Sequence, residues 1–149
     1  MSTWKQQALI EAPVEDVWEL ISDPSRFPEW GGDTVEVTGM PTKIEKGSTF
    51  RQTGRSPLGF KGTTTLKVEE LDDLREIKMR CQRSGYYSHW LLTEARGNTF
   101  ADVEMGVETA GLKGLSARAL GAAHTKGYLR RQAEQSLDGL RRVLKRERR

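Results

Sequence analysis

Side chains that commonly carry catalysis are few and scattered in this sequence of 149 residues, which contains two histidines and one cysteine. His89 alternates with Trp90 on a predicted strand and should point away from the core, and His124 falls on the polar side of a predicted helix. Neither histidine has a carboxylate at a spacing that would orient it as a general base. Two separated histidines without a clustered set of acidic residues or cysteines predict no metal site, and nothing predicts a cofactor.

Nucleophilic chemistry is equally unsupported by the spacing of hydroxyl and thiol groups. Cys81 lies on a predicted strand, where a small buried side chain is expected. The hydroxyls of Thr64, Ser88 and Thr125 have no adjacent base to activate them. The paired glycines at 31–32 and those at 111–114 do not match the spacing of phosphate-binding loops. Any function must therefore rest on a less specific set of side chains.

The segment from Ile10 to Trp30 contains the clearest local structural signals. Pro13 suits the first turn of a helix, where its missing N–H has no cost. Apolar residues then recur at helical spacing at Val14, Val17, Trp18 and Ile21. Asp23-Pro24 ends that helix, and Pro28 follows closely, so we expect a short turn or helical loop that presents Phe27 and Trp30.

The rest of the chain divides into alternating segments and one long helical segment. Strands are predicted at 3–11, 34–38, 48–55, 60–71, 74–83, 86–95 and 99–109, and short turns between the later strands imply an antiparallel meander. From about Leu115 the apolar period is helical, through Leu115, Ala119, Ala122, Leu129, Ala133, Leu137, Leu140 and Leu144. These elements predict one α+β domain that spans residues 1–149.

The pattern I-x-A-P-x-x-x-V-W-x-x-I-x-D-P, followed by F-P-x-W, resembles the opening of the START-related superfamily. That superfamily includes polyketide cyclase/dehydrase-like proteins and birch-pollen-allergen-like proteins, and the element order extends the resemblance over the whole chain. It implies a helix-grip fold, in which a curved antiparallel sheet of about seven strands wraps around the long C-terminal helix. Two short helices after the first strand would close one end, and a cavity would lie between sheet and helix. The superfamily includes cyclases, lipid carriers, hormone receptors and chaperone cofactors, so function must be argued from the site.

Strand parity identifies the side chains expected to face such a cavity. The lining is largely apolar with a few polar groups, which is typical of a small-molecule pocket. The candidate ligand-binding residues are Phe27, Trp30, Phe50, Gln52, Met79, Arg83, Tyr86, Ser88, Trp90, Met105, Thr125 and Lys126. Phe27 and Trp30 are expected at one rim of the cavity. If Arg83 or Lys126 is enclosed, an acidic ligand is the natural partner, because an unpaired buried cation is costly.

Two further features concern access and charge. Leu58-Gly59-Phe60 after Pro57 could cap the cavity mouth as a gate. The net charge is +3, but nine basic and three acidic residues from Lys126 onward give this end a net charge of +6. These cations could contact an anionic surface or a partner, or they could form a solvated helix end. No aromatic residue lies between the six cations from Arg141 to Arg149, which disfavours nucleic acid.

The composition favours a soluble protein, because 30% of the residues are charged and no apolar run is long enough to span a bilayer. The first residues lack the apolar core of a signal peptide, so we expect a cytoplasmic protein. A monomer or a weak homodimer is expected.

Three functions remain open. The leading prediction is binding of a small hydrophobic or amphipathic molecule for storage, transport or sensing. The resemblance also allows a cofactor-free polyketide cyclase, aromatase or dehydratase, for which Tyr86, Arg83 and Ser88 are the available polar groups, with no obvious inward carboxylate. The third function is interaction with a protein or an anionic surface, through the basic C-terminal end or the outward residues Glu76, Lys78 and Arg80.

Overall fold

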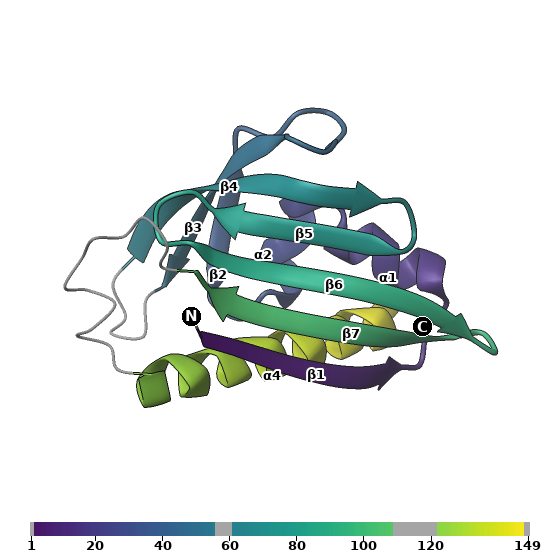
Figure 1. The fold of residues 1–149 in the computed structure, drawn as a ribbon. Coiled ribbons are helices and arrows are strands. Elements are labelled where there is room, and N and C mark those ends of the chain that lie inside the picture. The colour runs from purple at the N-terminus through teal and green to yellow at the C-terminus, as the bar shows by residue number, and fades with distance from the viewer. Residues whose placement is uncertain (1, 56–60, 109–121, 148–149) are drawn as a thin grey trace.

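A seven-stranded antiparallel sheet and a long C-terminal helix dominate the computed structural model, which describes residues 2–55, 61–108 and 122–147. The strands are β1 (Ser2–Ile10), β2 (Thr34–Thr38), β3 (Thr49–Arg55), β4 (Lys61–Asp72), β5 (Glu76–Cys81), β6 (Tyr86–Ala95) and β7 (Asn98–Val107). Their order in the sheet is β1-β7-β6-β5-β4-β3-β2. Because β1 pairs with β7, the first strand forms the edge of the sheet that lies next to the C-terminal helix (Figure 1).

Helices cover one face of this sheet. The helical elements are α1 (Val14–Ile21), the 3₁₀ turn η1 (Pro24–Arg26), α2 (Phe27–Trp30) and α4 (Ala122–Glu147). Figure 1 shows α4 running along the β1 and β7 side of the sheet, with α1 and α2 behind the strands. The sheet is irregular between Val68 and Glu70 of β4 and between Thr34 and Glu36 of β2. Such irregularities increase strand bending, which helps the sheet to curve around the helices.

Local sequence explains where α1 begins and ends. Pro13 precedes its first turn, Glu15 and Asp16 place negative charge near the positive end of the helix dipole, and the inner side chains are buried. After the helix ends, the Asp23 carboxylate accepts a hydrogen bond from the Ser25 backbone amide and fixes the start of η1. The helix predicted after Pro13 and the short helical loop predicted after Asp23 are thus confirmed.

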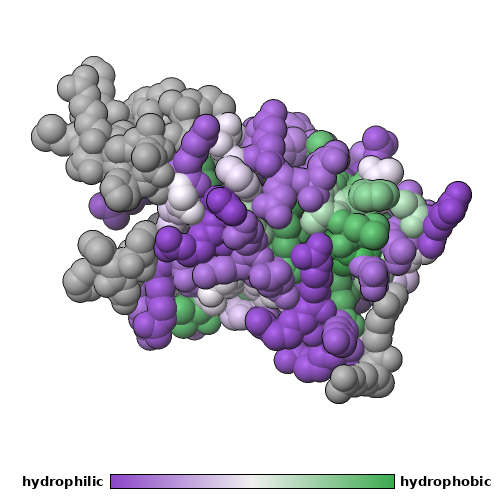
Figure 2. Space-filling view, turned by 90° about the horizontal axis from the view of Figure 1, so that it is seen from below, coloured by the Kyte–Doolittle hydropathy of each residue, from purple (hydrophilic) through white to green (hydrophobic). Residues whose placement is uncertain are grey.

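The apolar stripe of α4 forms one side of the core. Leu129, Ala133, Leu137, Leu140 and Leu144 are all buried, as their spacing predicts. The inner faces of β1 and of β3 to β7 supply the other side. Seen from the side of β1 and α4, the surface is mostly hydrophilic. Apolar residues show in a larger region right of the centre and in a smaller patch at the lower left (Figure 2).

The predicted helix-grip fold is confirmed, and most predicted strand ends agree with the structure within two residues. One difference matters for the site: β5 ends at Cys81, two residues before the predicted end. The predicted helix start near Leu115 and the predicted gate at 58–60 lie outside the described residues. In the part of the chain that the structure describes, no helix is long and apolar enough to cross a membrane.

Candidate ligand-binding site

An aromatic cluster fills one end of the space between sheet and helices. The ring centroids of Phe27 and Trp30 lie 5.3 Å apart, those of Phe27 and Phe50 5.9 Å, and those of Trp30 and Trp90 5.8 Å. The Trp30 indole N–H donates a hydrogen bond to the Leu20 carbonyl oxygen at 3.1 Å. Edge-to-face packing of this kind is favourable, and it leaves the four rings buried.

The expectation that Phe27 and Trp30 form a rim is therefore wrong. Their side chains are only 3% and 6% exposed, because the short helix α2 turns them inward onto β3 and β6. Phe27, Trp30, Phe50 and Trp90 close this end of the interior. Whether a ligand contacts them stays a prediction.

Two tyrosines mark a second, polar region further along the interior. Tyr86 on β6 and Tyr128 on α4 have ring centroids 6.4 Å apart. The Tyr86 hydroxyl donates a hydrogen bond to the thioether sulfur of Met105 on β7, at 3.0 Å. Because thioether sulfur is a weak acceptor, this contact satisfies the phenol only partly. A ligand with a stronger acceptor, such as an oxygen atom, could therefore replace Met105 as the hydrogen-bond partner of this hydroxyl.

A carboxylate lies near the two tyrosines. Asp33 lies between α2 and β2, and its Oδ2 accepts a hydrogen bond from the Gln132 side-chain amide on α4. Burial raises the pKa of Tyr86 and the pKa of Tyr128, and the negative charge of Asp33 raises both pKa values further. Both phenols therefore remain protonated at neutral pH and can act as hydrogen-bond donors. We refer to Asp33, Tyr86, Met105, Tyr128 and Gln132 as the polar cluster.

The neighbouring strands extend this region with small polar groups. Gln52 lies opposite Thr64 in the β3–β4 pair, and Ser88 lies opposite both Met79 and Met105. All of these positions share the inner face of the sheet, as strand parity predicts. Gln52, Thr64 and Ser88 are partly buried. Tyr86, Ser88, Met79 and Met105 are thus neighbours on the inner face, and Gln52 lies on the same face three strands away.

Cys81 is also on this face and is 4% exposed. Burial acts to raise the pKa of its thiol. Hydrogen bonds from Ser84, from the Arg83 backbone amide and from the Thr64 hydroxyl stabilise the thiolate and lower the pKa below its ordinary value. The prediction of a buried small side chain agrees with this position.

The two predicted interior cations are not enclosed. Arg83 follows the end of β5 in an exposed turn, and Lys126 is exposed on the first turns of α4. Neither cation is enclosed, because β5 ends before Arg83 and Lys126 lies at the exposed start of α4. Whether either residue contacts a ligand stays a prediction. Thr125 lies in α4, but its side chain is outside the described part.

Asp33 is a partly buried carboxylate beside the inner residues, where no obvious inward carboxylate was expected. Sequence reasoning missed it because it lies in a connection, where strand parity assigns no face. Tyr128 and Gln132 were missed because they flank the leucine stripe. Their i, i+4 spacing, directly before Leu129 and Ala133, is the signal that could have placed them on the inner side.

The outer face of the sheet holds a separate ionic network. His89 Nε2 lies 2.6 Å from Glu76 Oε2, so the expectation that no carboxylate orients a histidine is wrong. The two residues are on neighbouring strands, β5 and β6, so their spacing within a single strand could not predict the contact. Lys78 and Arg80 lie about 5 Å from the Tyr87 ring centre on the same face. This network does not reach the polar cluster, because it lies on the opposite side of the sheet.

An open groove of about 890 Å³ lies beside α1 and η1. Trp18, Met40, Ile44 and Leu71 supply its apolar part, and Asp23 and Lys43 are among its charged residues. Within the described ranges, no group of three or more metal-binding side chains was found here or elsewhere.

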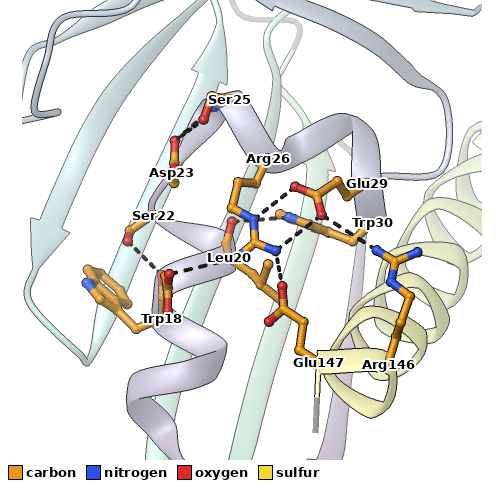
Figure 3. Close-up of polar contacts among 11 residues, drawn as sticks. Trp18, Leu20, Ser22, Asp23, Ser25, Arg26, Glu29, Trp30, Arg146 and Glu147 are labelled. Carbon is orange, nitrogen blue, oxygen red and sulfur yellow. Dashed lines mark hydrogen bonds and ion pairs between the residues drawn. The ribbon is translucent and has the colours of Figure 1, made fainter. Parts of the chain in front are cut away.

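An ionic brace holds the C-terminal end of α4 against α2. The Arg26 guanidinium lies between Glu29, at 2.9 Å, and Glu147 of α4, and Arg146 approaches Glu29 at 3.7 Å (Figure 3). Hydrogen bonding to Glu29 and Glu147 raises the pKa of Arg26, and the bond from Arg26 lowers the pKa of Glu29. Part of the basic C-terminal end is therefore used within the protein.

Comparisons with known proteins bear on this architecture. Residues 1–145 match the family model described as polyketide cyclase/dehydrase and lipid transport. A search of curated proteins found no significant match.

Solved structures resemble the fold over nearly its whole length. A START superfamily protein from Mycobacterium smegmatis superimposes with a TM-score of 0.74 at 14% identity, covering 98% of this chain and 99% of the other. A polyketide cyclase-like protein from Corynebacterium glutamicum has a TM-score of 0.69 at 16% identity, covering 97% and 92%. The protein NE0264 from Nitrosomonas europaea has a TM-score of 0.71 at 15% identity, covering 99% and 96%. At these identities the likeness shows the fold alone.

Proposed function

Because the chain belongs to the polyketide cyclase/dehydrase and lipid transport family, we propose that it binds a small, largely apolar molecule between the sheet and α4. The apolar part of the ligand would lie against the inner faces of β5 to β7. Its polar end would lie at the polar cluster. The aromatic cluster of Phe27, Trp30, Phe50 and Trp90 would close the far end.

The observation that carries the proposal is the state of the Tyr86 hydroxyl. It is a protonated donor in a partly buried position, and the partner it has among the described residues is the Met105 sulfur. Buried polar groups are normally well satisfied, so a donor with a weak partner beside a carboxylate favours a ligand-binding role over a purely structural one. The small polar side chains of Gln52 and Ser88 would supply adaptable contacts to the same ligand end.

Binding can be tested directly on the purified protein. Native mass spectrometry should detect a copurified small molecule that is released by denaturation. The neutral fluorescent probe N-phenyl-1-naphthylamine should then bind to the delipidated protein, with emission that rises on binding. Absence of both a copurified molecule and probe binding would refute the proposal.

Variants at two adjacent tyrosines provide a matched comparison. Tyr86→Phe removes the inner hydroxyl, whereas Tyr87→Phe removes a hydroxyl from the outer face. Tyr86→Phe should change the affinity for a polar-ended ligand, and Tyr87→Phe should not. An equal effect of both variants would indicate a general loss of structure.

A cofactor-free cyclase or dehydratase is a second candidate, and Asp33 favours it. A carboxylate can accept a proton from carbon next to a carbonyl group, while a protonated phenol donates a hydrogen bond to the carbonyl oxygen. Asp33 and Tyr86 are the groups of that type in the polar cluster. Conversion of an aromatic polyketide precursor that is lost in both Asp33→Asn and Tyr86→Phe, but kept in Tyr87→Phe, would establish this activity.

A further inference from the structure

We infer that Asp33 and Tyr86 make this site selective for uncharged, carbonyl-bearing apolar molecules and against carboxylic acids. The inference rests on the proposed function, because it concerns the ligand class of the same site. It opposes the expectation of an acidic ligand, which depended on Arg83 or Lys126 being enclosed. Both of these cations are exposed.

The charge of the polar cluster is negative in the part of the chain that the structure describes. Asp33 has no ion-pair partner there, and the side chain that donates to it is the neutral amide of Gln132. Gln132 lies one helical turn after Tyr128 on α4, and the Tyr128 ring lies against that of Tyr86, so Asp33 is near both phenols. Its negative charge accordingly raises the pKa of each phenol. A ligand carboxylate next to Tyr86 would meet this charge in a partly buried region, where water screens it less than in bulk solvent. Like charges brought together without a counter-ion strongly disfavour binding.

The hydrogen-bonding groups favour a carbonyl acceptor. The Tyr86 hydroxyl lies 3.0 Å from the Met105 sulfur, which a carbonyl oxygen could replace as a stronger acceptor. Met105 has a flexible side chain that can adjust when the hydroxyl turns to the ligand. Tyr128, whose ring lies against that of Tyr86, is a second protonated phenol at the same place. The polar cluster can therefore donate hydrogen bonds to a neutral acceptor, whereas the charge of Asp33 repels an anion.

Decanoate and its methyl ester are suitable probes, because they share one acyl chain and differ in charge. Displacement of N-phenyl-1-naphthylamine at neutral pH would report the affinity of each. We expect the wild-type protein to bind methyl decanoate at least about tenfold more tightly than decanoate. Equal affinities, or tighter binding of decanoate, would overturn the inference.

Two variants assign the selectivity to its residues. Asp33→Asn keeps an oxygen that can accept from Gln132 but removes the charge, so affinity for decanoate should rise about tenfold and the preference for the ester should largely disappear. Tyr86→Phe should weaken ester binding about three- to tenfold, as expected for one lost hydrogen bond. Tyr87→Phe is the matched control and should leave both affinities unchanged. An unaltered preference in Asp33→Asn would contradict the assignment.

The same experiment separates this inference from the function on which it rests. If the fluorescent probe does not bind the wild-type protein at all, the proposed function fails. If the probe binds and both competitors displace it equally, binding stands and the charge selectivity fails. Circular dichroism of each variant identifies a loss of fold.

Discussion

Gly139 allows a close approach of α4 to α2. A Cβ atom built there would lie 2.1 Å from the Trp30 carbonyl oxygen, which belongs to the backbone and cannot turn aside. Gly139→Ala should therefore push the helices apart and destabilise the protein by about 1–3 kcal/mol, the usual cost of overpacking. Urea unfolding followed by circular dichroism would measure the change.

Gly127 offers the control on the same helix. A Cβ atom there would meet nothing within 4 Å, and the position is exposed. Gly127→Ala should stabilise the protein by up to about 1 kcal/mol, because alanine favours helix more than glycine does. If the two substitutions had similar effects, the close approach of α4 to Trp30 would be in doubt.

Residue types and alternation predicted the inner face well but could not place side chains in connections. Ile77, Met79 and Cys81 are buried as their alternation predicts. Asp33 and Arg83 lie where no repeating pattern applies, so one inward carboxylate was missed and one outward cation was misplaced. The polar chemistry of the candidate site depends on these irregular positions.

Among the elements, α4 depends on the Arg26 brace at its C-terminal end. The Arg26 side chain is 20% exposed and contacts Glu29 and Glu147. Arg26→Met should lower the free energy of unfolding by about 1–2 kcal/mol, more than expected for a fully exposed pair. Arg75→Met, which removes an exposed pair with Asp72, should change it by less than about 0.5 kcal/mol. Equal losses in the two variants would contradict the importance of the brace.

The brace also predicts how stability changes in acid. Arg26 lowers the pKa of Glu29 in the folded protein below its unfolded value, so the unfolded state binds a proton first as the pH falls. The contribution of Glu29 is present at neutral pH and is lost as the pH falls through the folded pKa. The wild-type protein should therefore lose more stability than Arg26→Met on going from about pH 5 to about pH 3. If the free energy of unfolding changed with pH in the same way in both proteins, Arg26 would not be what lowers the pKa of Glu29.

The spacing of apolar residues predicted these elements and their order, including the buried stripe of α4. It could not predict the brace, because Arg26 and Glu147 are 121 residues apart and their contact depends on how α4 crosses α2. The same reason applies to the Asp33–Gln132 contact, which joins residues 99 positions apart. Contacts between elements follow from the fold and not from any local pattern.

For the whole molecule, the distribution of the three tyrosines predicts an alkaline response. Burial raises the pKa of Tyr87 to about 12 on the outer face, and the pKa values of Tyr86 and Tyr128 are also raised. In the unfolded chain all three should ionise near pH 10. Between the unfolded and the folded pKa values, the folded state holds more protons than the unfolded state. The contribution of the tyrosines to stability is therefore fully present below about pH 10 and falls as the pH rises further.

An ultraviolet titration would test this response with one signal. The native protein should show little tyrosinate absorbance near pH 10, and the absorbance should then rise together with the loss of the circular dichroism signal. In strong denaturant the same three groups should titrate near pH 10 without a cooperative step. A tyrosine that ionised near pH 10 in the folded protein would show that a phenol is open to water. If Tyr86→Phe removed that early signal, the polar cluster would be more solvated than its ligand selectivity requires.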